Sequence, residues 1–369
     1  MAWWMGTLLA AGTALAGYGD ASNGLPTHAE REVHFWTNAV RVDPGAFADD
    51  YPCSFGSFTS TESSPKWPLY WNEGLGAAAN YHSTDMNVDG YFDHDSNDGT
   101  SWSTRIYSFY SGSTIGENIA WGYGSPYSAV VEGWMCSSGH RANIMSTSFD
   151  ELGTGVSGTY YTQDFGNGSP PNRAIAMGIH LPATPSGTVQ FGADWALDTG
   201  PDALFVVLDG ERHDMSLYVG DATGYSAWAT EAAIGGGCHE YYFVGQSQGL
   251  EQTFPETGSY GFGSCDFDDA GAGWLAGQIP WEVDEVTTPD PTGDPDPTDG
   301  DDPEDDDAEG DDDDDHDDAE DDDDTEDDDD SLNGDLREEH AAGGCQVATG
   351  LPGVSGLFLT VFALYRRRR

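Results

Sequence analysis

Three residues suited to covalent chemistry lie close together in the sequence. Ser137 and Ser138 precede His140, so a hydroxyl nucleophile and an imidazole base could meet within a short stretch of chain. No nucleophile elbow surrounds these serines, and no acid stands beside them to orient the imidazole. No His-Glu-x-x-His helix, phosphate-binding loop or dinucleotide fingerprint occurs in the 369 residues. The sequence therefore lacks the local signatures of these reactions, although it does not exclude catalysis.

The elements that would position such residues begin with two helices. Thr27 and Glu30 form a capping box, which predicts a helix that places Trp36 on its apolar face. Asn72 precedes a second helix, whose packing face carries Leu75, Ala78, Ala79, His82 and Met86 at helical spacing. On this face we expect His82 to be packed rather than to bind a ligand.

Strands follow these helices. Residues 115–121, 152–157 and 160–165 have strand patterns, and Ser125-Pro126 predicts a further helix between them. Helices followed by a mixture of strands and helices indicate an α+β layer architecture for residues 27–168.

Residues 171–281 have a different pattern, made of short β segments separated by turns such as Asp209-Gly210. This predicts a small β-sandwich domain, loosely similar to immunoglobulin-like modules. The expected strands are 189–196, 204–208, 215–219 and 241–244.

The first residues read as an export signal. The apolar run from Met5 ends in Ala14-Leu15-Ala16, which fits the small-x-small cleavage pattern and predicts a signal peptide over residues 1–16. The segment Ala2-Trp3-Trp4 lacks the usual Lys or Arg, so a buried helix of a cytosolic protein is the alternative.

Five cysteines in an exported chain predict two disulfides and one unpaired thiol. Pairing within each half, Cys53 with Cys136 and Cys238 with Cys265, is the simplest of the connectivities that the sequence allows. Cys345 then stands alone, just ahead of the final apolar run.

The formal net charge is −54, and 34 of the 66 acidic residues lie between residues 282 and 339. A surface of this sign repels nucleic acids and anionic membranes, so neither is expected as a partner. Residues 282–340 have almost nothing to bury and are predicted to be a disordered linker. Asp294, Asp296 and Asp299-Gly300 faintly resemble a calcium loop, but the spacing differs from that of an EF-hand and no closing Glu is in place.

A series of motifs in the first half occurs in the order found in one protein family. They begin in the predicted second helix and end in the last of the first-half strands. The chain resembles the bacterial form of the CAP family (also called SCP), which comprises cysteine-rich secretory, antigen 5 and pathogenesis-related-1 proteins. The motifs are residues 78–86, Phe92-Asp93-His94, Asp98-Gly99, Arg105, residues 116–120, residues 134–145, Phe149, Gly153, Gly155 and residues 161–165.

This resemblance implies an α-β-α sandwich with a central cleft, in which His94 and His140 are the cleft histidines and Glu117 is the acid. Two imidazoles and one carboxylate suit an open site for a divalent metal such as zinc. Ser137 stands where eukaryotic members have a second Glu, so the ligand set is thinner. The alternatives are a hydrogen-bonded histidine pair that supports the fold and a Glu117 carboxylate that only stabilises the strands.

The C-terminal segment, residues 343–369, contains Gly343-Gly344-Cys345, an apolar run over residues 351–365 and four terminal arginines. It resembles the C-terminal sorting signals of myxobacterial surface proteins, which implies processing near Cys345. The alternative is an unprocessed membrane anchor. Both interpretations place the domains outside the cell.

Together these features predict an exported, surface-anchored, monomeric binding module. Its cleft would take a small apolar or lipid-like ligand or a divalent metal, and an envelope or cell-surface protein is another possible partner. The first alternative is a metal-dependent hydrolase with Glu117 as base, and the second is a structural envelope or adhesion protein. We expect no enzymatic activity.

Overall fold

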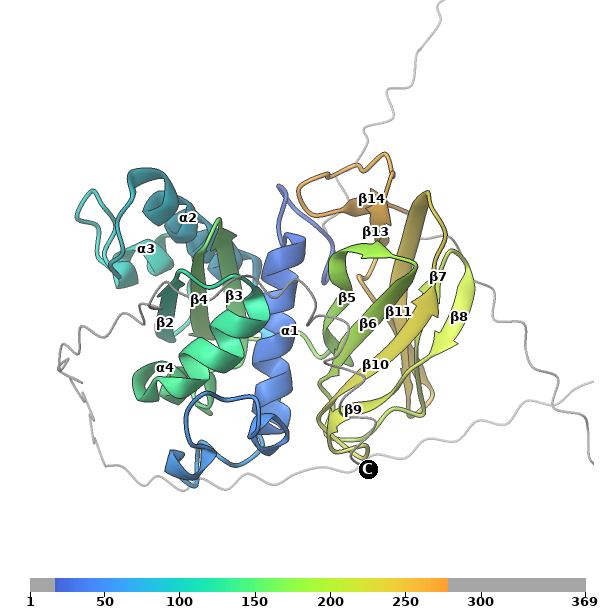
Figure 1. The fold of residues 1–369 in the computed structure, drawn as a ribbon, viewed down its shortest axis with the longest axis horizontal. Coiled ribbons are helices and arrows are strands. Elements are labelled where there is room, and N and C mark those ends of the chain that lie inside the picture. Colours follow the sequence, from blue (N-terminus) through green and yellow to red (C-terminus); the bar gives the residue numbers. More distant parts are fainter. Residues whose placement is uncertain (1–16, 278–369) are drawn as a thin grey trace, which may run out of the picture. The chain divides into compact units, whose positions relative to one another are not determined.

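The computed structural model describes residues 17–277, shown in Figure 1. The predicted signal peptide (1–16), acidic linker (282–340) and C-terminal segment (343–369) lie outside these residues. In chain order the helical elements are α1 (His28–Val42), η1 (Pro44–Phe47), η2 (Phe55–Ser57), α2 (Glu73–Asp89), α3 (Trp102–Phe109), the π-helical turn η3 (Ser128–Gly133), η4 (Trp134–Cys136) and α4 (Ser138–Ile144). The first-half strands are β1 (Tyr70–Trp71), β2 (Thr114–Trp121), β3 (Glu151–Ser157) and β4 (Tyr160–Asn167).

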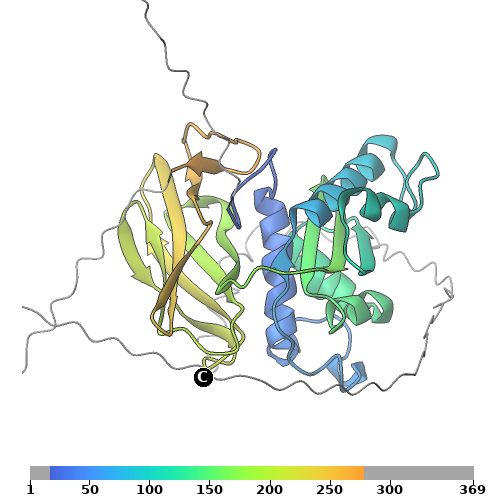
Figure 2. The same ribbon diagram turned by 180° about the vertical axis from the view of Figure 1, so that it is seen from behind.

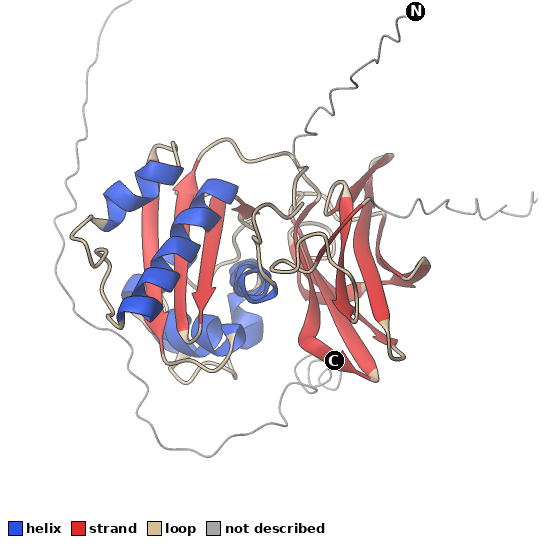
Figure 3. Cartoon of the chain, turned by 90° about the horizontal axis from the view of Figure 1, so that it is seen from above, coloured by secondary structure: helices blue, strands red, loops and turns tan. Residues whose placement is uncertain are grey.

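The first half has three layers around a sheet with the strand order β1-β3-β4-β2. Figure 3 shows helices on both faces of this sheet. The alternation of side chains along the strands sorts the contacts by face. Thr162 bonds to Ser83 of α2, whereas the next residue, Gln163, bonds to Thr37 of α1. This α+β arrangement agrees with the predicted fold class.

The helix α2 lies directly on the backbone of β3. A Cβ atom at Gly155 would lie 2.1 Å from the carbonyl oxygen of Ala79, and one at Gly153 would lie 2.0 Å from the carbonyl carbon of Leu75. Only glycine allows this approach, because any side chain would collide with the helix backbone. The glycines in the motifs thus bring α2 close to the sheet.

The helix α1 is buried on both sides. It contacts β3 of the first half and β5, β6, β9 and β10 of the second half, and Figure 2 shows it between the two halves. Phe35 packs where β6 has Gly192, at which a Cβ atom would meet the Phe35 ring at 2.6 Å. One hydrophobic cluster runs from Val33 to Trp274. The boundary predicted near residue 170 therefore separates two architectures that share one core.

Polar residues of α1 are buried together with its apolar ones, and each finds partners. Arg31 donates to the carbonyls of Pro26 and Ala272 and lies over the Tyr260 ring at 3.6 Å. Asn38 donates to the Leu69 carbonyl at 3.0 Å and accepts from the Leu69 N–H at 2.8 Å. The capping box of Thr27 and Glu30 is confirmed. Hydrogen bonding removes the penalty that buried polar groups would otherwise impose.

The second half consists of two sheets that face each other (Figure 1). The four expected strands are confirmed within a few residues. Strands β5, β8, β10, β12, β13 and β14 were not predicted. The strands are β5 (Ile175–Ser186), β6 (Thr188–Trp195), β7 (Ala203–Leu208), β8 (Glu211–Asp214), β9 (Ser216–Gly220), β10 (Ser226–Ala233), β11 (Cys238–Ser247), β12 (Leu250–Phe254), β13 (Gly258–Gly263) and β14 (Trp274–Ala276).

The predicted disulfides are confirmed. Cys53 pairs with Cys136 and Cys238 pairs with Cys265. The helix expected after Ser125-Pro126 is irregular, since its α-helical start passes into a π-turn and then a 3-10 turn. Within residues 17–277, no helix combines the length and apolar character needed to cross a bilayer.

Candidate functional site

The candidate site lies along β2, the edge strand of the first-half sheet. Successive residues of this strand point to opposite faces. Glu117 points to the face covered by α2 and α3, where its side chain is 1% exposed. Asn118 points to the other face, where it bonds to Gln163 at 3.0 Å. Neighbouring residues of β2 therefore contribute side chains to the site on opposite faces of the sheet.

The Glu117 carboxylate joins two cationic side chains. Its Oε1 lies 2.8 Å from His94 Nδ1, and its Oε2 accepts a hydrogen bond from Arg105. The Arg105 side chain is 2% exposed, whereas the His94 side chain is 47% exposed. The His94 imidazole therefore lies at the surface, and its Nδ1 atom is held by the buried Glu117 carboxylate.

The charges of this trio act on one another. Burial alone would raise the pKa of Glu117, but the hydrogen bond with His94 and the charge of Arg105 outweigh it and lower the pKa. Burial alone would lower the pKa of His94, but the hydrogen bond and charge of Glu117 raise it above its ordinary value. Both shifts favour a charged pair of His94 and Glu117.

Asp164 adds a second carboxyl group to the site. It lies opposite Glu117 in the register of β2 and β4 and is fully buried. Burial first, and then the negative charge of Glu117, raise the pKa of Asp164 well above its ordinary value. Two neighbouring buried carboxyl groups do not both ionise readily, so Asp164 is the protonated member of the pair.

The loop that carries His94 is held by buried side chains. Arg105 Nη1 donates to the His94 carbonyl at 2.9 Å and to Ser96 Oγ at 3.0 Å. The Nε2 atom of His82 lies 3.0 Å from the Asp93 carbonyl oxygen. Burial lowers the pKa of His82 to about 4, so this fully buried imidazole is neutral. His82 supports the loop, as its place on the packed face of α2 predicted.

On the other face, side chains from η4 and α4 cover the edge of β2. Trp134 Nε1 donates to the Ile119 carbonyl at 3.0 Å, and Asn143 Nδ2 donates to the Glu117 carbonyl at 3.2 Å. These bonds satisfy carbonyls that would be unpaired at the edge of the sheet. Trp134 and Asn143, both in the motifs, therefore supply β2 with hydrogen bonds that a neighbouring strand would otherwise provide.

His140 reaches the site through its backbone. Asn118 Nδ2 donates to the His140 carbonyl at 3.1 Å, while His140 Nδ1 is buried without a hydrogen-bond partner. Burial first, and then the charge of His94, lower the pKa of His140 to about 4. His94 thus contacts Glu117 directly, whereas His140 is close enough to His94 for the charge of His94 to lower the His140 pKa.

The geometry does not fit the metal set suggested by the resemblance. Within residues 17–277, no three His, Cys, Asp or Glu side chains are grouped so that they could hold a metal ion. Both oxygens of Glu117 are already taken by His94 and Arg105. A zinc ion at His94 and His140 would therefore lack a free carboxylate ligand.

Sequence reasoning missed two of the site's residues and one motif. Arg105 and Asp164 stood in the motifs without a role, although pairing of the two predicted strands would have placed Asp164 opposite Glu117. Residues 245–249 match the Gly-x-Ser-x-Gly pattern, but Ser247 lies at the hairpin that joins β11 to β12 and not at a strand-to-helix elbow.

Aromatic side chains adjoin the site. Trp121, at the end of β2, is 39% exposed and stacks on Tyr160 with ring centroids 5.6 Å apart. The half-buried Phe92 ring lies 6.3 Å from the Trp121 ring and precedes His94 by two residues. We call Phe92, Trp121 and Tyr160 the aromatic rim.

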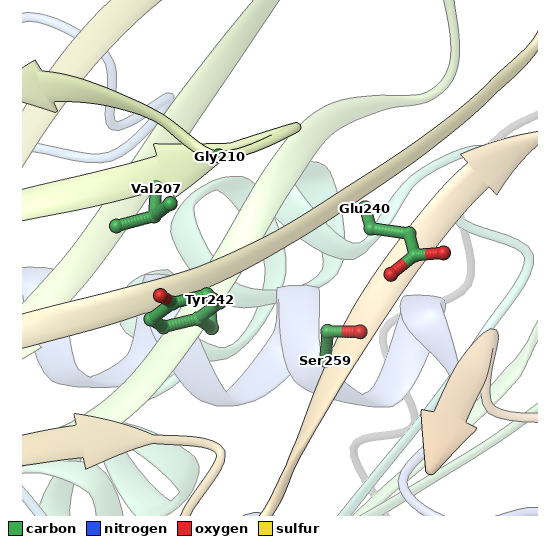
Figure 4. Close-up of a pocket in the computed structure, with 5 residues that line it drawn as sticks. All are labelled: Val207, Gly210, Glu240, Tyr242 and Ser259. Atoms are coloured by element: carbon green, nitrogen blue, oxygen red, sulfur yellow. The ribbon is translucent and has the colours of Figure 1, made fainter. Parts of the chain in front are cut away.

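A small pocket occurs in the second half, lined by residues of β7, β11, β13 and the turn between β7 and β8 (Figure 4). Its lining contains one carboxylate and two hydroxyls but no imidazole or thiol, so it lacks the groups of the His94 site. The lining residues are Val207, Gly210, Glu240, Tyr242 and Ser259.

Comparison with known proteins supports a family assignment for the first half. Residues 37–166 match the model of the cysteine-rich secretory protein family (CAP). The chain is 38% identical over 143 residues to the uncharacterized membrane protein YlbC of Bacillus subtilis, which covers 38% of this chain and 35% of that protein. It is 43% identical over 101 residues to the uncharacterized protein YkwD of the same organism, which covers 27% of this chain and 39% of that one.

The chain therefore spans little more than a third of the length of these relatives. A crystal structure of an extracellular SCP-domain protein from Bacillus anthracis shares 35% identity, with a TM-score of 0.26. The match covers 27% of this chain and 34% of that one.

Proposed function

We propose that this chain is an exported surface protein whose first half, with residues 37–166 matching the CAP family model, binds a small ligand at the His94 site. The two disulfides support export, since such bonds persist in oxidising compartments. The relative YlbC is described as a membrane protein, which fits attachment to an envelope through residues 343–369.

The His94 imidazole is the observation that carries the binding proposal. Its Nδ1 is fixed by the buried Glu117, while nearly half of the side chain is exposed. The second ring nitrogen, Nε2, is therefore left to meet a ligand in a defined orientation. A polar group held in place by buried neighbours binds with a smaller loss of conformational entropy than a mobile one.

The aromatic rim supports an apolar ligand that carries one polar group. The Phe92 ring, two residues before His94, lies 6.3 Å from the Trp121 ring, and such rings contribute large apolar area with few rotatable bonds. The exposed Asp93 and Asp95 flank His94, which disfavours an anionic ligand. A lipid-like alcohol or sterol has the matching chemistry.

Native mass spectrometry of the full exported chain tests this proposal, with cholesterol and a long-chain alcohol as probes. We expect a one-to-one complex with at least one probe, weakened about tenfold or more in His94→Ala and in Trp121→Ala. The matched control is His213→Ala, in strand β8 of the second half, which should bind as the unchanged chain does. Equal binding by all three variants, or no complex with either probe, would instead favour a purely structural role.

A further inference from the structure

The first described residues form a tight turn against the second half of the chain, seen in dark blue in Figure 2. The Gly17 nitrogen donates to Asp20 Oδ2 at 2.7 Å, and the Asp20 N–H donates to the Gly17 carbonyl at 3.1 Å. Tyr18 N–H donates to Glu256 Oε2 at 2.7 Å, and Glu256 N–H donates to the Tyr18 carbonyl at 2.9 Å. This turn is fixed to the segment between β12 and β13.

Position 17 has no room for a side chain. A Cβ atom there would lie 2.7 Å from the Cβ atom of Glu256 and 3.0 Å from its Oε2. The nitrogen of residue 17 therefore bonds to the Asp20 carboxylate, and the residue itself lies against the Glu256 side chain.

Only one of these two carboxylates is paired with a cationic side chain. Glu256 pairs with Arg173 at 2.6 Å. Asp20 is 4% exposed and accepts hydrogen bonds from the N–H and hydroxyl groups of Thr257. Within the described part of the chain, no Arg, Lys or His forms an ion pair with Asp20. A buried carboxylate without a cation is costly, so a positive charge at this place would stabilise the fold.

We propose that the missing cation is the chain's own α-ammonium group, released when a leader-removing peptidase hydrolyses the bond between Ala16 and Gly17. Water is the co-reactant: the C–N bond breaks, the hydroxyl joins the Ala16 carbonyl carbon, and the Gly17 nitrogen takes up protons. The residues before the bond, Ala14-Leu15-Ala16, fit the cleavage pattern. This inference rests on the export part of the proposed function and is independent of the ligand.

Cleavage changes the chemical group with which Gly17 donates a hydrogen bond to Asp20. The uncut chain offers Asp20 one neutral amide N–H, whereas the processed chain offers a charged group with three donors. The ion pair between the processed N-terminus and Asp20 would therefore stabilise the packing of residues 17–20 against the second half.

The first test determines the N-terminal residue of the full exported protein by intact mass and sequencing, and Gly17 is expected. The second compares two leaderless chains that end at Arg369 and begin with Gly17 or with Ala16. At pH 6.5 the Gly17 chain should unfold about 3–6 °C higher, because only its amine can reach Asp20. The difference should vanish above pH 9.5, where an α-amine of ordinary pKa near 8 is neutral.

Asp20→Asn supplies the matched control, since the amide keeps the size of the side chain without its charge. In this background the Gly17 and Ala16 chains should unfold at the same temperature. If Asp20→Asn does not fold, the comparison of the two unsubstituted chains decides alone. A mature N-terminus elsewhere, equal stability of the Gly17 and Ala16 chains at pH 6.5, or a difference that survives Asp20→Asn overturns the proposal. Loss of ligand binding would leave it untouched.

Discussion

Replacing Arg105 with methionine should destabilise the protein strongly, because it leaves a buried carboxylate without its cation. The Arg105 side chain is 2% exposed and the Glu117 side chain 1%. Methionine fills a similar volume but carries no charge and no donor. Three acceptors lose their partner: Glu117 Oε2, the His94 carbonyl and Ser96 Oγ.

The magnitude follows from burial. Breaking a buried ion pair by removing one partner costs about 3–5 kcal/mol, because the remaining charge is uncompensated. Part of this cost is avoided if Glu117 takes up a proton, so we expect a loss of about 3 kcal/mol at pH 7 and a smaller loss at pH 4. A second substitution, Glu117→Gln, removes the unpaired charge and should recover part of the loss.

Urea unfolding of the full chain, followed by tryptophan fluorescence, measures these differences. Arg212→Met is the matched control, since Arg212 pairs with Asp214 at the surface, where the side chains are 36% and 73% exposed. Exposed pairs contribute about 0–1 kcal/mol, so this variant should stay close to the unchanged protein. The reasoning is refuted if Arg105→Met costs no more than Arg212→Met.

Three further predictions concern the fold. A chain that ends at residue 170 exposes the face of α1 around Phe35, so it should bind a hydrophobic dye and show no cooperative thermal unfolding; a sharp transition would contradict the shared core. Replacing Cys53 and Cys136 together with serine removes a crosslink over 83 positions and should lower the free energy of unfolding by about 2–5 kcal/mol, measured in urea. An unchanged midpoint of urea unfolding in this variant would contradict the prediction. Because the pKa of Asp164 is raised in the folded state, stability should fall as the pH rises above about 3.9. Asp164→Asn removes the titrating group and should flatten this fall between pH 4 and 7; an equally steep decline would contradict the assignment of the proton.

The helices that begin with strong local signals could be predicted from the sequence. The capping box at Thr27 and Glu30 and the cap at Asn72 satisfy free N–H groups at the start of their helices. The burial of the second face of α1 could not be predicted, since polar side chains such as Arg31 and Asn38 are rarely buried without partners from elsewhere in the chain. Their partners include the Leu69 carbonyl, 31 positions from Asn38, and the Ala272 carbonyl, 241 positions from Arg31, which no local pattern reveals. Only the fold brings Ala272 to Arg31.

The second half was harder to predict because its missed strands lack strong β-forming patterns. Strand β13 contains three glycines within Gly258–Gly263, and β10 is rich in alanine. Both residue types are depleted in strands, and here packing against neighbouring strands overrides that tendency.

In the site, His94, Glu117 and His140 followed from the family resemblance. The buried Arg105 and the protonated Asp164 depend on distances between elements, and therefore required the structure.

The most direct test of the site is the pKa of the His94 imidazole, measured by NMR titration of the full chain. The account predicts a value above the ordinary 6.5, because Glu117 holds Nδ1 and supplies a negative charge. In Glu117→Gln the value should fall below that of the unchanged protein, as burial then acts without the charge. A His94 pKa that is the same in both proteins would contradict the claim that Glu117 charges and orients this imidazole.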